Sequence, residues 1–73
     1  MESFAKALET VAGVMRHGAA SHPDNDWVRR TLEYHIGRAE EYRALLREGD
    51  QRRDHLAHAA TRLLMALTLR EFT

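Results

Sequence analysis

The chain has 73 residues, enough for one domain and too few for two. It contains no cysteine, which excludes disulfide bonds, cysteine-ligated zinc and thiolate catalysis. Its 11 basic and 11 acidic residues cancel, so it lacks the broad positive field of a protein whose principal ligand is nucleic acid.

No segment is predicted to lie in a membrane. No apolar run approaches the ~20 residues that a spanning helix needs. Residues 1–6 lack the basic stretch and the long apolar core of a signal peptide. We therefore expect a cytoplasmic protein without a membrane partner.

The first predicted helix covers about residues 3–17. Its apolar side chains recur at steps of three and four and so share one helical face: Phe4, Leu8, Val11 and Met15. Ser3 is predicted to cap its start and Gly18 to follow its end. Residues 18–25 contain the only proline, so we expect a loop that reverses the chain.

The second predicted helix begins near Asp26 and covers about residues 26–48. Its inward face is predicted from residues at helical spacing: Val28, Leu32, His35, Ile36, Ala39, Tyr42 and Leu46. Gly37 weakens the helix by roughly 1 kcal/mol relative to alanine, which indicates close packing or a bend at that position.

The third predicted helix covers about residues 51–70. Gly49 and Asp50 precede it and are predicted to end the second helix and cap the third. It has the clearest apolar face of the three: Leu56, Ala59, Ala60, Leu63 and Leu67, flanked by Leu64 and Ala66. The sequence therefore predicts an all-α, single-domain unit of three helices.

A second apolar edge occurs on two of these helices, and one chain of this size cannot easily bury it. Its members are Trp27, Tyr34 and Leu45 on the second helix and Met65 and Leu69 on the third. Scattered surface apolar residues are common, but a tryptophan and four others in so small a chain favour an interface between copies. We expect a homodimer or higher oligomer that completes a helical bundle.

The most suggestive polar cluster lies at the start of the third helix. Asp54 and His58 are four residues apart and share one face, with Arg62 a turn further on. Such a pair can hold a divalent metal, or the carboxylate can orient the imidazole as a proton acceptor. The simpler interpretation is a surface Asp-His pair whose first-turn aspartate the helix dipole favours.

Side chains of the second helix could join this cluster. His35 is typical of a hydrogen-bonded core histidine, unless it faces the histidines of the third helix across the helix pair. Glu40 and Glu41 point about 100° apart, so at most one of them joins an inward site. Carboxylates suit Mg²⁺, and arginines such as Arg38, Arg43 and Arg62 could clamp phosphates. Hydrolysis of a nucleotide polyphosphate is therefore one chemistry open to this bundle.

Several short strings of the sequence together carry a family resemblance. They are residues 14–19 (Val-Met-Arg-His-Gly-Ala), 25–27 (Asn-Asp-Trp), 34–42, 49–50 (Gly-Asp) and 55–60 (His-Leu-Ala-His-Ala-Ala), the last followed by the apolar run 63–67. In this order, from about Leu8 onward, they resemble the small phage-type dATP/dGTP diphosphohydrolases. That family is similar to the MazG all-α nucleoside triphosphate pyrophosphohydrolases.

The resemblance implies hydrolysis of a purine deoxynucleoside triphosphate to its monophosphate and pyrophosphate, with Mg²⁺ or Mn²⁺. It also implies an oligomeric helical bundle of phage origin in the host cytoplasm. Under this hypothesis His58 and Asp54 are the catalytic residues, and Glu41 joins them as a metal ligand. Arg38 and Arg62 are the phosphate-binding residues.

The sequence departs from the family pattern in three places. Tyr42 and Arg43 stand where the family has an Arg-His pair, and the acidic segment before the histidines, residues 49–54, is short. MazG proteins carry a third glutamate three residues after a Glu-Glu pair, but here Ala44 is at that position after Glu40 and Glu41. These departures lower the number of metal ligands. The chain could therefore keep the fold of the family and lack its catalytic activity.

The alternative function is a phage-encoded, non-enzymatic module that binds a host defence or regulatory protein. Trp27, Tyr34 and Leu45 would form its docking edge. The histidine cluster favours the enzyme, and the missing acidic ligands favour the binding module.

Overall fold

Three α-helices and one short 3-10 helix make up the described part of the chain. The computed structural model describes residues 2–21 and 26–72, with α1 at Glu2–Ser21, the 3-10 helix η1 at Asp26–Arg29, α2 at Leu32–Arg47 and α3 at His55–Glu71. These ranges contain no strand, so the predicted all-α class of three helices is confirmed. None of these helices is long and apolar enough to cross a membrane.

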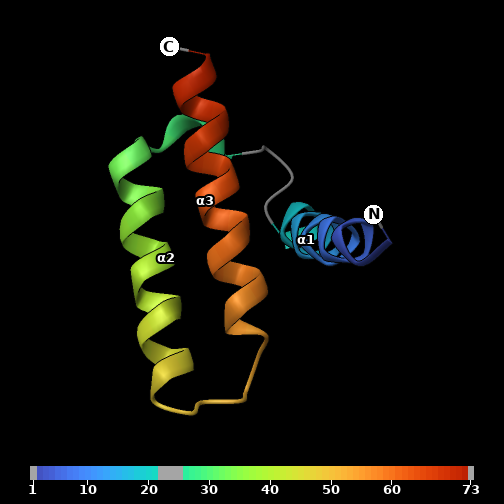
Figure 1. Ribbon diagram of the computed structural model, residues 1–73. Helices are drawn as coiled ribbons and strands as arrows, with labels where there is room; N and C mark the ends of the chain where they lie inside the picture. The colour runs from blue at the N-terminus through green and yellow to red at the C-terminus, as the bar shows by residue number, and fades with distance from the viewer. Residues whose placement is uncertain (1, 22–25, 73) are drawn as a thin grey trace.

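Helices α2 and α3 form an antiparallel hairpin, and α1 stands beside α3 (Figure 1). Within the described residues α1 contacts α3 but not α2, and η1 also contacts α3. Because α3 has neighbours on two sides, it is the central element of the fold.

Helix α2 begins at Leu32, so the predicted start near Asp26 is wrong. Thr31 has extended backbone angles, and its side chain accepts a hydrogen bond from the backbone N–H of Tyr34 at 3.0 Å. A threonine in this position caps a helix and satisfies one of its free N–H groups. The residues from Asp26 to Arg29 form the separate helix η1 instead of extending α2.

The turn after α2 has the hydrogen bonds of a Schellman motif. The N–H of Gly49 donates to the carbonyl of Leu46, and the N–H of Asp50 donates to that of Leu45, each at 3.1 Å. Gly49 has a φ of 83°, a left-handed conformation that glycine adopts without strain. The prediction that α2 ends at Gly49 is therefore confirmed.

Helix α3 begins at His55, four positions later than predicted, because Asp54 is its N-cap. The Asp54 carboxylate accepts a hydrogen bond from the N–H of Ala57 at 3.0 Å. Asp50, which was expected to cap the helix, accepts from the N–H of Arg52 instead. The predicted start at residue 51 is therefore wrong, and the cap belongs to Asp54.

Helix α1 is longer than predicted at both ends. Ser3 lies inside the helix, as does Gly18, and the helix continues to Ser21. Alanine has the highest helix propensity, so the two alanines after Gly18 offset part of the roughly 1 kcal/mol that the glycine costs. Residues 22–25 of the predicted loop lie outside the described residues.

Most of the buried side chains among the described residues are small or polar. Among the described residues the buried apolar ones are Ala39, Tyr42, Ala57 and Ala66, and the buried polar ones are His35, His55 and Thr61. Alanines let two helices approach closely and leave room beside them for larger rings. This core is thin, and it has few large apolar side chains to stabilise it.

The apolar face predicted to point inward on α3 is exposed. Leu56 is 64% exposed, Leu63 52% and Leu67 44%, and Ala60 is exposed as well. At 100° per residue these positions lie roughly opposite the face of α3 that packs inside the chain. The prediction is wrong because the buried residues of α3 are His55, Ala57, Thr61 and Ala66, although the leucine face is the more apolar.

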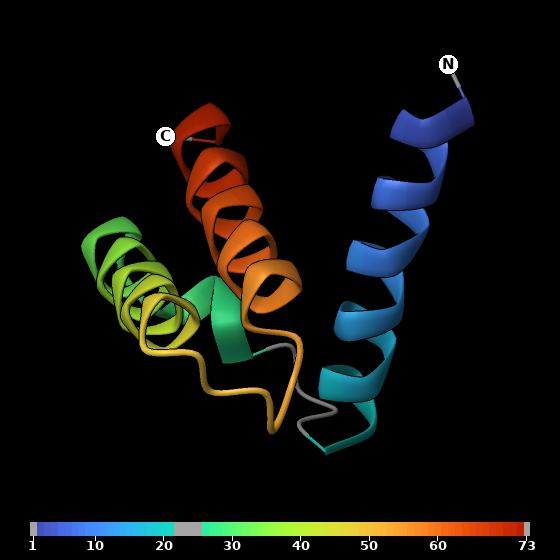
Figure 2. The same ribbon diagram turned by 60° about the horizontal axis from the view of Figure 1, so that its bottom comes forward.

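The inward faces predicted for α2 and α1 are only partly confirmed. His35, Ala39 and Tyr42 are buried, and Leu32, Val11 and Met15 are partly buried. The exposed members are Val28, Ile36, Leu46, Phe4 and Leu8. Figure 2 shows why α1 splits in this way: its N-terminal half diverges from α3. A Cβ on Gly37 would meet nothing within 4 Å, so the close packing predicted there is wrong.

Candidate functional site

A pocket of about 410 Å³ opens between the C-terminal half of α1, η1 and the α2–α3 hairpin. Its positively charged lining residues are Arg30, Arg53 and Arg62, and its aromatic ones are Trp27, Tyr34 and Tyr42. His17, His58 and Asp26 also line it, and Asp26 is the one carboxylate among the described lining residues. The volume lies in the range of small-molecule sites, which are about 300–1,000 Å³.

The lining is strongly positive although the chain as a whole has no net charge. Three arginines and one aspartate are the Arg, Lys, Asp and Glu residues among its described lining residues. Guanidinium groups bind phosphate and carboxylate oxygens through paired N–H donors. The pocket therefore suits an anion, and its aromatic rings add a surface on which a flat ring can stack.

Buried His35 holds one of these arginines in place. Its side chain has no exposed surface. Its Nδ1 lies 3.1 Å from a terminal nitrogen of Arg62, and its Nε2 lies 2.8 Å from the carbonyl oxygen of Trp27. A guanidinium group can only donate, so Nδ1 accepts and Nε2 carries the hydrogen that it donates to the carbonyl. The prediction that His35 is a hydrogen-bonded core residue is confirmed.

The ring of Tyr34 positions two arginines on the pocket wall. The guanidinium carbons of Arg30 and Arg62 lie 4.9 Å and 5.8 Å from its centroid. Both distances are within the range of cation–π attraction. Since Arg30 follows η1 and Arg62 is on α3, this ring joins positive charges from two separate segments.

His58 lies against a second tyrosine of the pocket. Its ring centroid is 5.1 Å from that of Tyr42, with the ring planes tilted by 34°. Burial lowers the pKa of His58 below its ordinary value of 6.5; the positive charge of Arg53 lowers it further, whereas Asp54 acts in the opposite direction. His58 is therefore predominantly neutral at pH 7 and can accept a proton or a hydrogen bond.

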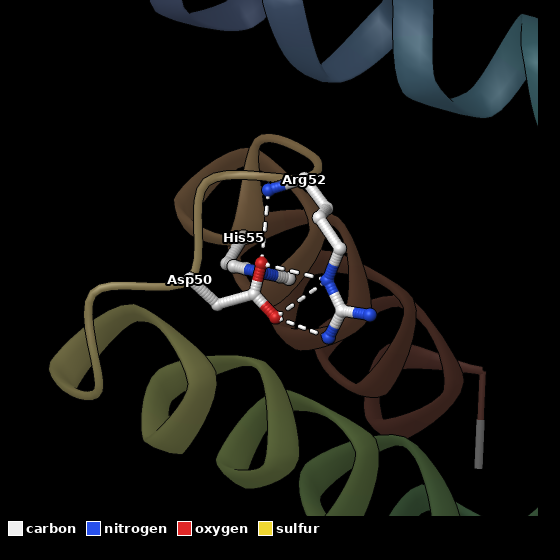
Figure 3. Close-up of polar contacts among 3 residues, drawn as sticks. All are labelled: Asp50, Arg52 and His55. Carbon is white, nitrogen blue, oxygen red and sulfur yellow. Dashed lines mark hydrogen bonds and ion pairs between the residues drawn. The ribbon is translucent and has the colours of Figure 1, made fainter.

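A separate polar cluster fastens the turn between α2 and α3 (Figure 3). Both carboxylate oxygens of Asp50 accept from Nε of Arg52, at 3.1 and 3.0 Å, and one also accepts from its backbone N–H at 2.9 Å. These bonds hold the pKa of Asp50 well below its usual range. His55, only 4% exposed, places its Nε2 3.5 Å from the same carboxylate. The bonds between Asp50 and Arg52 therefore hold the turn, and the Asp50 carboxylate lies close to the first residue of α3.

The structure separates the residues predicted to form one site. His58 and Arg62 line the pocket described above, whereas Arg38 and Glu41 line a smaller hollow beside Asp50. Arg38 donates to a carboxylate oxygen of Glu41 at 2.9 Å and to the hydroxyl of Tyr42 at 3.1 Å. Arg38 and Arg62 thus line two different hollows.

The residues present do not fit the Mg²⁺ or Mn²⁺ expected from the resemblance. Glu41 is paired with an arginine, and the Asp54 carboxylate is occupied as the N-cap of α3, although its charge acts on nearby His58. Over residues 2–21 and 26–72, no group of three or more His, Asp or Glu side chains could hold a metal ion. We therefore assign no step to a metal.

The five residues predicted as an interface between copies lie in different surroundings. Trp27 and Met65 line the pocket and are partly buried, and Tyr34 lines it with 38% of its surface exposed. Leu45 lines the smaller hollow, and Leu69 is partly buried on α3. They do not form one continuous exposed edge, and their role between copies stays a prediction.

Reasoning from the sequence missed several residues of the pocket. Arg30 precedes Tyr34 by four residues, a spacing that could have indicated their contact. Tyr42 was recognised only as a core residue. Arg53 and His17 gave no signal, because their positions depend on the α2–α3 turn and on how α1 docks on α3.

Comparison with known protein families, with curated proteins and with solved structures finds no match for this chain. The resemblance to the phage-type diphosphohydrolases therefore stays a prediction, and a functional assignment depends on the geometry of the pocket.

Proposed function

We propose that the chain binds a purine deoxynucleotide in the pocket between α1 and the α2–α3 hairpin. One observation carries the proposal: three arginines and three aromatic side chains line a single cavity of about 410 Å³. A nucleotide combines an anionic phosphate chain with a flat aromatic base. These two parts are what such a lining recognises.

The arginines would bind the phosphates, and Arg62 is the best prepared of them. Its hydrogen bond to His35 and its position over Tyr34 fix the guanidinium group before a ligand arrives. A side chain that is already held loses less conformational entropy on binding than a free one. Arg30 and Arg53 would supply the remaining positive charge from the segment after η1 and from the α2–α3 turn.

The aromatic residues would bind the base. Trp27 is on η1 at the pocket wall, and stacking of a base on an aromatic ring contributes about 1–3 kcal/mol. Stacking distinguishes bases weakly, so the preference for a purine comes from the family resemblance. The phage origin and the cytoplasmic location implied by that resemblance belong to the same proposal.

Hydrolysis to the monophosphate and pyrophosphate is the reaction that the resemblance implies. The neutral His58 imidazole could accept a proton from an attacking water molecule, as a general base does. Because Glu41 is paired with Arg38 and the Asp54 carboxylate caps α3, the proposal is nucleotide binding, and hydrolysis is tested separately.

Titration calorimetry tests the binding proposal. We expect dATP and dGTP to bind, and deoxyadenosine to bind much more weakly because it lacks phosphate. Arg62→Met should weaken dATP binding by at least about tenfold, since a charge-assisted hydrogen bond contributes about 1.5–3 kcal/mol. Arg43→Met is the matched control, because Arg43 is exposed on α2 and lines neither hollow.

The outcomes of these titrations separate the possibilities. Absence of dATP and dGTP binding, or equal weakening by Arg43→Met and Arg62→Met, would overturn the proposal. Pyrophosphate release from bound dATP, with Mg²⁺ or Mn²⁺ and with chelator, then distinguishes an enzyme from a binding protein. If the chain hydrolyses dATP, His58→Ala should abolish release while binding persists.

Binding to a host protein is the second candidate function. The observation that favours it is the apolar surface that the fold leaves uncovered, including Leu56, Leu63 and Phe72. It predicts a stoichiometric complex that His58→Ala leaves intact. Leu63→Glu should disrupt the complex, because Leu63 is 52% exposed on this surface, whereas Trp27, which was predicted as part of the docking edge, lines the pocket.

A further inference from the structure

Two helices of this chain carry apolar rows with the spacing of a coiled-coil seam. The α1 seam is Phe4, Leu8, Val11 and Met15, and the α3 seam is Leu56, Ala60, Leu63 and Leu67. Each row advances by four, three and four residues, the step that keeps a row of side chains facing a partner helix. A seam of this kind is stable only when another helix covers it.

The α3 seam has no cover within the described residues. Its leucines are 44–64% exposed, and its alanine is exposed as well. Both neighbours of α3 pack on its opposite side, since the lining of the pocket takes His58, Arg62 and Met65 from α3. Leu67 follows His58 by nine residues, which at 100° per residue places the two half a turn apart.

The α1 seam is covered only over its second half. Phe4 is 60% exposed and Leu8 51%, whereas Val11 and Met15 are partly buried. The N-terminal half of α1 projects away from the hairpin in Figures 1 and 2. Nothing in the hairpin reaches Phe4 or Leu8 closely enough to remove them from the surface.

The total accessible surface indicates how much is left to cover. The chain exposes 5770 Å², while a folded monomer of this size exposes about 4,600 Å². Its radius of gyration is 12.5 Å, against about 11 Å for a compact domain of the same length. The excess, about 1,200 Å², is enough for one side of a standard protein interface, which takes about 800 Å² from each partner.

We propose that a second copy of this chain covers the α3 seam, with Phe4 and Leu8 of α1 extending the buried surface. Each copy offers two seams of the same spacing, so the chain is complementary to itself. Its net charge of zero leaves no long-range repulsion between copies. The interface therefore lies on the face opposite Met65, and it differs from the one predicted from the sequence.

The test is the mass of the full chain in solution, measured by size-exclusion chromatography with light scattering over a range of concentrations. The wild type should have twice the mass of one chain. Leu63→Glu combined with Leu67→Glu should weaken the dimer by at least a hundredfold, because pairing would bury four carboxylates. Leu46→Glu is the control, since Leu46 is 45% exposed on α2 and outside both seams.

Circular dichroism shows whether each variant keeps its helices. If the α3 variant loses them, Phe4→Ser combined with Leu8→Ser decides the question, and it should weaken the dimer by at least tenfold. A wild type that stays monomeric at high micromolar concentration overturns the proposal. A dimer that neither seam variant weakens, or that Leu46→Glu weakens as strongly, overturns it too.

Discussion

Arg62, on the wall of the candidate pocket, donates a hydrogen bond to His35, a histidine with no exposed surface. The other ring nitrogen of His35 donates to the carbonyl of Trp27 on η1. One buried ring therefore links α2, α3 and η1 at the pocket. A residue expected to stabilise the core also positions the side chain that we propose binds phosphate.

Replacement of His35 by leucine should destabilise the fold. The change leaves the Trp27 carbonyl and the Arg62 guanidinium group without their shared partner, and each lost partner costs about 1–3 kcal/mol. We expect the free energy of unfolding in urea to fall by about 2–6 kcal/mol. His17→Leu, at an exposed position on α1, should change it by less than about 0.5 kcal/mol. Similar losses in the two variants would contradict this account.

Asp54 should act as a helix cap, and its charge should be dispensable. Its carboxylate accepts a hydrogen bond from the Ala57 N–H at 3.0 Å. Asp54→Ala should therefore lower the free energy of unfolding by about 0.5–2 kcal/mol, while Asp54→Asn, which also caps helices, should lose much less. Thermal unfolding of both variants checks this. If Asp54→Asn is as harmful as Asp54→Ala, the carboxylate has a role that its charge supplies.

Two glycines should respond to alanine with opposite signs. Gly37 is inside α2, where an added Cβ meets nothing within 4 Å, so Gly37→Ala should raise the free energy of unfolding by up to about 1 kcal/mol. Gly49 has a φ of 83°, so Gly49→Ala should lower it by about 1–2 kcal/mol. Urea unfolding of the two variants measures both effects, and the same sign for both would show that one backbone conformation is wrong.

His58 should make the fold less stable in mild acid. Burial and Arg53, with smaller contributions from His55 and Arg62, place its pKa in the fold below the ordinary 6.5, and Asp54 opposes them. The unfolded chain then binds the proton at a higher pH than the folded chain. The stability associated with His58 is complete above pH 6.5 and is lost as pH falls through the pKa of the folded state.

Urea midpoints of the wild type at neutral pH and near pH 5 measure this dependence. His58→Gln should reduce the difference between the two midpoints, and His17→Gln, at an exposed position, should leave it unchanged. An equal difference in wild type and His58→Gln would show that another group is responsible.

The helical class and the end of α2 were predictable because their signals are local. Helical periodicity predicts each helix, and Gly49 predicts where α2 ends. The start of α2 was missed because Asp26 and Thr31 are both good capping residues, and tertiary structure selects Thr31. Asp50 was predicted to cap α3 in place of Asp54 for the same reason, because both are aspartates, which cap helices well.

The faces of α3 could not be ranked from the sequence alone. Leu56, Leu63 and Leu67 make the more apolar face, so hydrophobicity predicts that they point inward. The buried residues of α3 are instead His55, Ala57, Thr61 and Ala66, which are small or polar. An apolar row predicts that a helix face is buried. It does not show whether the same chain or a second chain buries it.

The candidate site was partly predictable. His58 and Arg62 share a helical face at a spacing of four residues, and they do line one pocket. Glu41 and Arg38 were assigned to the same site, because the sequence does not give the rotation of α2 against α3. The structure places that pair in the smaller hollow, 2.9 Å from each other.

The most direct test of nucleotide binding uses Trp27, the only tryptophan of the chain, which lines the pocket. Its fluorescence can be followed during a titration with dATP, with excitation where the nucleotide does not absorb. The account predicts a saturable change in emission that Arg62→Met shifts to at least about tenfold higher dATP concentration and that Arg43→Met leaves in place. Emission that stays constant up to millimolar dATP and dGTP would contradict it.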